Sequence, residues 1–159
     1  MSLWISKNKS NTLIDIATRT GLRLRIEKEV NPEVRRACLE FARWLRKEYY
    51  FPVRVPVYIK AAKFIKAVDG DEVSATFFGP FERDVEPYIR VATGDYYDLE
   101  VENGEDDALA AILHSIAHEL THYYQWILSK EMTVDGEEKQ AVRSASYVIG
   151  KYRLTRDHP

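Results

Sequence analysis

The first blocks of apolar and polar residues predict a strand followed by a helix. Leu22–Ile26 alternates apolar and basic side chains, which is the pattern of a half-buried strand. Asn31 and Pro32 then open a stretch with apolar residues three and four positions apart, which predicts a helix with Asn31 as its N-cap. Because Pro52 disfavours helix at the residue before it, this helix is expected to end near Tyr49.

Short strands dominate the middle of the chain. Asp69-Gly70-Asp71 is typical of a hairpin turn, and Pro56 indicates an interruption or an exposed edge in the strand that contains it. The polar stretch 95–107 is expected to be a loop. The strands are predicted at 53–59, 62–68, 73–78 and 87–92.

Two helices, at about 105–129 and 136–152, are predicted to end the fold. A helix, a run of strands and two helices indicate an α+β fold, with the helices packed on one mainly antiparallel sheet. The 159 residues favour a single domain. Residues 1–12 and 153–159 are expected to be loosely attached.

The composition excludes several classes of protein. A net charge of −2 gives no general attraction to nucleic acid or to anionic lipid. The lone Cys38 excludes an intramolecular disulfide and fits a reducing compartment. The N-terminus lacks the apolar core of a signal peptide, so a cytoplasmic location is expected. Residues 108–128 have the length of a membrane span, but the histidines and the glutamate among them predict a helix inside a protein.

Residues 118–122 read His-Glu-Leu-Thr-His, an HExxH motif. Positions i and i+4 share a helical face, so both imidazoles are able to reach one metal ion. Glu119 lies beside them and is placed to take a proton from a water whose pKa zinc lowers to about 7. Glu119 is also the only formal charge in residues 108–128, and burying an unpaired carboxylate is costly. The alternative is that these three side chains only hydrogen-bond within the fold.

A catalytic zinc commonly takes three protein ligands, and the last helix offers a third. Its apolar stripe, extended back by one turn, falls on Glu138, whereas Glu137 lies about 100° away around the helix. We therefore expect Glu138 to face inward as the ligand and Glu137 to face solvent. The alternative for either residue is a solvated acid of the first turn. Asp135 is another ligand candidate, but it is expected to be an N-cap instead.

The motif at 118–122, followed by Glu-Glu-Lys-Gln-Ala at 137–141, resembles the gluzincin clan of metallopeptidases. In size and order of elements the chain is similar to the minigluzincins. The resemblance implies a zincin-like fold, in which a backing helix and a sheet precede an active-site helix and a glutamate helix. It also implies a peptide or protein substrate and a Zn²⁺ ion.

Residue by residue, the resemblance implies His118, His122 and Glu138 as zinc ligands and Glu119 as general base and acid. Thermolysin-like members carry an aspartate four residues after the ligand glutamate, where this chain has Val142. The side chain that orients a histidine must therefore come from elsewhere.

The chain offers weak candidates for the remaining roles. Tyr147, Tyr152 and His158 are candidates for stabilising the oxyanion, and core packing is the alternative for the two tyrosines. His114 shares the face of His118 and either supports the site from outside the ligand set or is a hydrogen-bonded core histidine. Strand 73–78 resembles, by its order, the zincin edge strand that binds extended peptide. Its central residues Ala75, Thr76 and Phe77 are the substrate-binding candidates.

The function predicted is zinc-dependent hydrolysis of peptide bonds, without nucleic-acid or membrane partners. The oligomeric state is not predicted. Three alternatives stay open. The first is a non-catalytic zincin-fold protein that binds a metal or a partner. The second is a latent peptidase whose cleft is occupied by residues 1–12 or 153–159. The third is a hydrolase of non-peptide amides, which uses the same water chemistry.

Overall fold

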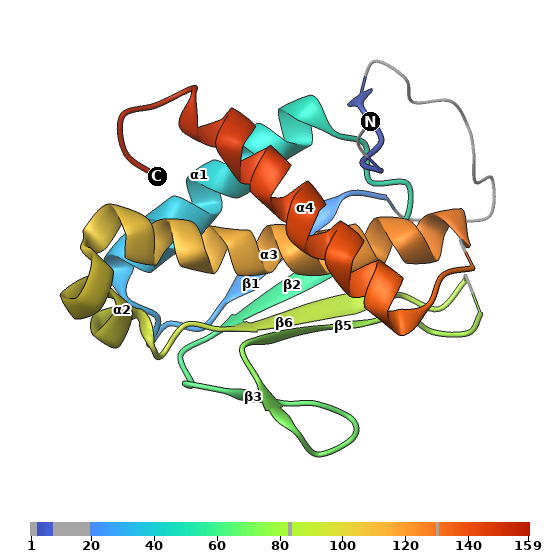
Figure 1. The fold of residues 1–159 in the computed structure, drawn as a ribbon, viewed down its shortest axis with the longest axis horizontal. Helices are drawn as coiled ribbons and strands as arrows, with labels where there is room; N and C mark the ends of the chain where they lie inside the picture. Colours follow the sequence, from blue (N-terminus) through green and yellow to red (C-terminus); the bar gives the residue numbers. More distant parts are fainter. Residues whose placement is uncertain (1–2, 8–19, 83, 130) are drawn as a thin grey trace.

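The computed structural model describes residues 3–7, 20–82, 84–129 and 131–159. It is an α+β fold, as predicted, in which the helices α1, α3 and α4 cover one face of a mixed four-stranded sheet (Figure 1). A two-stranded hairpin extends from the opposite side. The elements are β1 (Leu22–Ile26), α1 (Pro32–Glu48), β2 (Val55–Lys60), β3 (Ile65–Lys66), β4 (Glu72–Val73), β5 (Ala75–Phe78), β6 (Tyr88–Ala92), α2 (Tyr96–Asn103), α3 (Glu105–Leu128) and α4 (Val134–Arg153).

The sheet has the order β1-β2-β6-β5, and the prediction of a mainly antiparallel sheet is wrong. Strand β2 pairs in parallel with both β1 and β6, and only β5 is antiparallel to its neighbour. The reason lies in the connections, because α1 joins β1 to β2 and a long segment joins β2 to β6. Such crossovers return the chain in the same direction. Strand β5 is left at the edge of the described sheet.

Pro56 neither interrupts its strand nor marks an edge, contrary to the expectation. It lies inside β2, the second strand of the sheet. Val55 N–H donates to the Gly21 carbonyl on the β1 side, so the missing donor of Pro56 faces the β6 side. The pairing of β2 with β6 begins only at Val57 and Ile89, so the proline costs the sheet no hydrogen bond there.

The core lies between the sheet and the helices. The inward side chains of the three parallel strands, such as Leu22, Val57 and Val91, are 0% exposed. Burial of each apolar side chain of this size contributes roughly 1.5–3 kcal/mol. Helix α1 begins as predicted, with the Asn31 side chain accepting from Glu33 N–H. The long helix α3 lies over the sheet and packs against α4 (Figure 1).

The segment predicted as a loop, 95–107, forms helix α2 and the first turn of α3. Only Tyr96 of α2 is buried, so no repeating apolar stripe marks this helix in the sequence. The strand expected at 73–78 is divided between β4 and β5, and that expected at 62–68 shortens to β3. The predicted hairpin turn is present, and Gly70 takes the φ of 92° that glycine tolerates best.

Both ends of the described chain are attached to the fold. Leu3 and Trp4 are buried, and Trp4 Nε1 donates to Thr121 Oγ1 at 3.1 Å, whereas residues 1–2 and 8–12 lie outside the described residues. At the other end, the Pro159 carbonyl accepts from Arg36 Nη2. Thus the tail packs on α1 and does not occupy the space between α4 and β5. No helix among the described residues is long and apolar enough to cross a membrane.

Candidate metal centre

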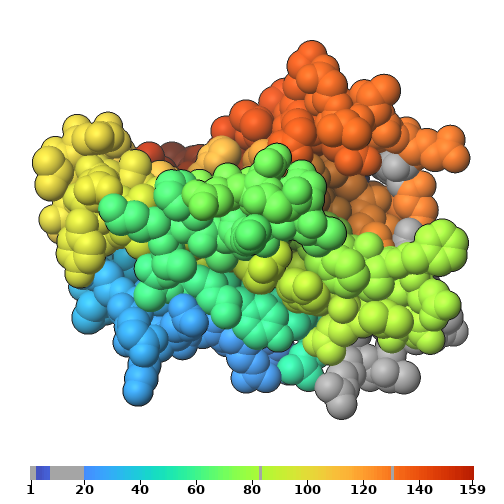
Figure 2. Space-filling view, turned by 90° about the horizontal axis from the view of Figure 1, so that it is seen from below, coloured from blue at the N-terminus to red at the C-terminus, as the bar shows by residue number. Residues whose placement is uncertain are grey.

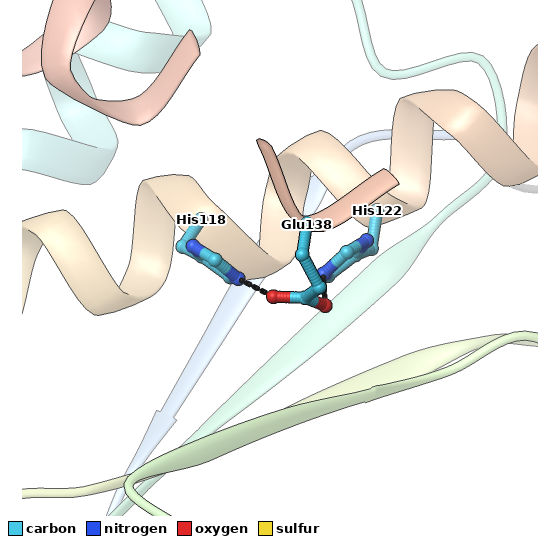
Figure 3. Close-up of side chains that lie close together, drawn as sticks. All are labelled: His118, His122 and Glu138. Atoms are coloured by element: carbon cyan, nitrogen blue, oxygen red, sulfur yellow. Dashed lines mark hydrogen bonds and ion pairs between the residues drawn. The ribbon is translucent and has the colours of Figure 1, made fainter. Parts of the chain in front are cut away.

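Helix α3 carries the three residues of the HExxH motif on adjoining faces. His118 and His122 are one turn apart, and their ring centroids are separated by 5.0 Å. Both rings are partly buried and turn their Nε2 atoms toward the same point (Figure 3). The long apolar register of α3 fixes this direction, because its opposite face is held by the core.

Glu138, in the first half of α4, reaches both histidines. Its Oε2 lies 3.1 Å from His118 Nε2 and its Oε1 lies 2.9 Å from His122 Nε2 (Figure 3). One ligand atom from each of the three residues falls within a span of 4.8 Å. The structure thus brings together the three side chains expected to bind metal, and their role as ligands stays a prediction.

The three side chains fit a zinc ion in chemistry and in spacing. Bond lengths of about 2.0–2.2 Å in a tetrahedral site put ligand atoms about 3.3 Å apart. The separations of 2.9 and 3.1 Å, which end on different oxygens of Glu138, need to open by a few tenths of an ångström, and the 4.8 Å span of the three ligand atoms must close toward the same distance. In addition, each imidazole nitrogen that faces the carboxylate must either carry a proton that it donates or share a metal ion with the carboxylate.

Gln125 fixes the orientation of His122. The Gln125 Nε2 donates to the Glu137 carbonyl at 3.1 Å and to Gln140 Oε1 at 2.9 Å, which leaves its Oε1 as an acceptor. This Oε1 lies 2.7 Å from His122 Nδ1. His122 therefore carries a proton on Nδ1, which leaves Nε2, the nitrogen that faces Glu138, as the atom to bind a metal. Gln125 supplies the orienting contact for which the sequence offered no candidate.

Glu119 lies behind the cluster and is 7% exposed. Burial raises the pKa of its carboxyl from the ordinary 4.5 to about 7; His122 and the backbone N–H of Phe77 oppose this change and the Glu138 carboxylate adds to it. Burial also lowers the pKa of His118, with a further lowering by His122 and opposition from Glu138. The lowered pKa favours the neutral imidazole, the form that binds metal.

An open cleft of about 790 Å³ passes over these residues. Figure 2 shows the hollow between the orange start of α4 and the green segments at the sheet edge. Its walls come from α3, from the first turns of α4 and from β5. The lining residues are Val73, Ala75, Thr76, Phe77, Gly79, His118, Glu119, His122, Gln125, Trp126, Ser129, Glu137 and Glu138.

The substrate-binding candidates of β5 all line this cleft. Ala92 N–H donates to the Ser74 carbonyl, and Thr76 stands opposite Arg90 in the same register. Because backbone groups alternate in direction along a strand, those of Ala75 and Phe77 point away from β6 and into the cleft. The contact of Phe77 N–H with Glu119 agrees with this direction. In contrast, the backbone N–H and carbonyl of Thr76 face β6.

The candidates for the oxyanion role do not reach the cluster. Tyr152 is 0% exposed and packs among aromatic rings of the core, while Tyr147 is on the surface beside Lys151. His158 pairs with Asp106 at the start of α3. None of these residues lines the cleft.

His114 stands beside the metal cluster without joining it. Its Nε2 lies 3.3 Å from Ser146 Oγ, and it lines a pocket of about 200 Å³ next to the cleft. This position matches a hydrogen-bonded histidine near the site, and His114 is not part of the convergent group.

Sequence reasoning missed three residues of the cleft. Gln125 follows His122 at helical spacing, which was the available signal. Trp126 forms a wall, where Gly79 approaches so closely that a Cβ would lie 2.7 Å from its ring. Glu137 was expected to face solvent; it is half-buried and lines the cleft. Nor is Asp135 the N-cap of α4, since the Thr133 side chain accepts from Gly136 N–H.

No protein-family model, no curated protein and no solved structure matches this chain. A proposal of function therefore rests on the chemistry and geometry of the site.

Proposed function

We propose that this chain is a zinc-dependent metallopeptidase of the gluzincin type, with a zincin-like fold. The observation that carries the proposal is the convergence of His118, His122 and Glu138 within 4.8 Å, at an open cleft and beside a buried carboxylate. Each part has a use in hydrolysis. A purely structural metal site needs neither the cleft nor the adjacent acid.

A zinc ion held by His118, His122 and Glu138 supplies Lewis acidity, lowering the pKa of water to about 7 and polarising a carbonyl. Glu119 takes a proton from the attacking water and passes it to the leaving amine. Its place in the cleft beside the two histidines suits both transfers, because a general base must lie within reach of the proton that it takes. Gln125 holds His122 in the required tautomer throughout.

Substrate binds as an added strand along β5. The backbone groups of Ala75 and the carbonyl of Phe77 face the cleft and are available to pair with an extended peptide, whereas Phe77 N–H contacts Glu119. The Phe77 side chain contributes to the apolar wall, together with Trp126 at a ring-centroid distance of 6.2 Å. An extended peptide in this position passes its backbone across the metal cluster.

One observation favours a second candidate, a non-catalytic or latent zincin-fold protein. Among the described lining residues, no tyrosine, arginine or lysine stands ready to stabilise an oxyanion, and the histidines are both in the metal cluster. Such a protein keeps the metal and the cleft but turns over slowly or not at all.

Hydrolysis by the zinc-loaded protein and by its Glu119→Gln variant separates the two candidates. The substrate is an unfolded protein with no bias in sequence, and new amino groups are counted. The proposal predicts cleavage by the wild type and a loss of at least about 100-fold in the variant, the scale of general acid–base catalysis. Zinc content serves as the control and stays equal. Cleavage at the same rate by both proteins refutes the role of Glu119, and no cleavage by either supports the second candidate.

A further inference from the structure

The cleft has one further carboxylate, that of Glu137, at one end. Gln125, Trp126 and Ser129 line this end, one to two turns of α3 beyond His122, and Glu137 faces them from α4. We name these four residues the distal subsite. Gln125 ties the two helices together here through its bond to the Glu137 carbonyl.

Glu137 contributes the carboxylate of the distal subsite, and no described residue neutralises it. The side chain is half-buried, and no hydrogen bond or ion pair joins its carboxylate to another described residue. The lining contains no lysine or arginine among the described residues. Glu137 does not belong to the group of side chains that converge as the metal cluster, which consists of His118, His122 and Glu138.

Two neighbours of Glu137 also favour a cation. Helix α3 ends at Leu128, and Ser129 caps it, so the negative end of a 24-residue helix dipole lies beside the subsite. The last turn of α3 carries no basic residue. Trp126 lines the same end of the cleft, and a tryptophan ring is able to attract an ammonium or guanidinium group. A carboxylate, a helix C-terminus and an indole therefore surround one place.

We propose that the distal subsite selects a lysine or arginine side chain of the peptide substrate, with Glu137 as the specificity-determining residue. The inference rests on the proposed peptidase function and names its substrate class. The lining supports it: Glu137 is a carboxylate outside the proposed ligands and base, and no described lining residue is a lysine or arginine that would offset its charge.

A different role for Glu137 is to stabilise α4 alone. It lies in the first turn of that helix, where an acidic side chain interacts favourably with the helix dipole. This role predicts a change in the stability of the fold and no effect on the choice of peptide. The two roles are therefore separable by experiment.

The test measures binding to the zinc-loaded Glu119→Gln protein, in which peptides are not consumed. Three capped ten-residue peptides of alanine and glycine carry a central lysine, norleucine or glutamate, and binding is followed by fluorescence anisotropy. We expect the lysine peptide to bind about threefold to tenfold more tightly than the norleucine peptide, as a partly exposed ion pair with a cation–π contact allows. The glutamate peptide binds most weakly, and added salt reduces the differences.

Adding Glu137→Gln to this protein should abolish the preference for lysine, and adding Glu137→Lys should reverse it in favour of glutamate. Zinc content and thermal unfolding confirm that each variant is folded and loaded. Equal binding of the three peptides, or an unchanged preference in both variants, overturns the inference and leaves the peptidase proposal intact. Absence of binding by every peptide refutes the peptide-binding function and the inference with it.

Discussion

Replacing Glu119 with glutamine should stabilise the metal-free protein while removing its activity. Burial raises the pKa of this carboxyl from 4.5 to about 7, so at pH 8 the fold holds a charge in a place that disfavours it. At ~1.4 kcal/mol for each pH unit, the penalty is about 3 kcal/mol. Glutamine removes the charge and keeps an oxygen to accept from Phe77 N–H. Allowing for lost attraction to His122, we expect a gain of about 1–3 kcal/mol at pH 8.

The gain should depend on pH in a defined direction. The folded chain holds the Glu119 proton more tightly than the unfolded chain, so the stability of the wild type falls as pH rises from about 4.5 to about 7. The variant lacks this slope, and its advantage should shrink below about 1 kcal/mol at pH 5, where the carboxyl is protonated in the fold.

Urea denaturation of the chelator-treated proteins at pH 5, 6.5 and 8 measures these differences. Glu102→Gln, at an exposed position of α2, is the matched control and should change stability by less than about 0.5 kcal/mol. A Glu119→Gln variant that is less stable than the wild type at pH 8, or whose advantage is the same at all three pH values, would refute the account of a strained, buried acid.

Three further outcomes follow from the contacts of the site and the core. Gln125→Leu removes the acceptor of His122 Nδ1–H and should weaken zinc binding about 10–100-fold in a chelator competition; unchanged affinity contradicts the orienting role. His114→Ala should keep one zinc per chain, because His114 pairs with Ser146 and not with the metal cluster; loss of zinc on metal analysis would make His114 a ligand. Burial raises the pKa of the Cys38 thiol to about 12, so alkylation at pH 8 should be slow in the native protein and fast in urea. Rapid native labelling would show that α1 is not packed as described.

The sequence predicted best where a local pattern repeats. The apolar periodicity of α3 and α4 gave both helices to within two residues at each end, and it selected Glu138 over Glu137 as the residue that faces the histidines. The HExxH spacing places both histidines on one face whenever the segment is helical, so the proximity of the two rings could be predicted from the sequence.

The predictions that were wrong concern features that depend on contacts between segments distant in the sequence. Parallel pairing of β2 arises from two crossovers, which no single strand records. Helix α2 is anchored by the one buried ring of Tyr96, too little for a periodic signal. Glu137 lines the cleft where α4 packs against α3, and Gln125 joins the two helices there by donating to the Glu137 carbonyl. Each correction therefore comes from tertiary structure that overrides local preference.

Zinc stoichiometry and affinity, in the wild type and in Glu138→Ala, test the central claim most directly. After dialysis, metal analysis and a chelator competition should find one zinc per wild-type chain and a loss of affinity of at least about 100-fold in the variant, because one of three protein ligands is gone. Glu137→Ala, one residue away, should bind zinc like the wild type. A wild-type protein that holds no zinc, or equal affinity in all three proteins, would contradict the assignment of His118, His122 and Glu138 as a metal centre.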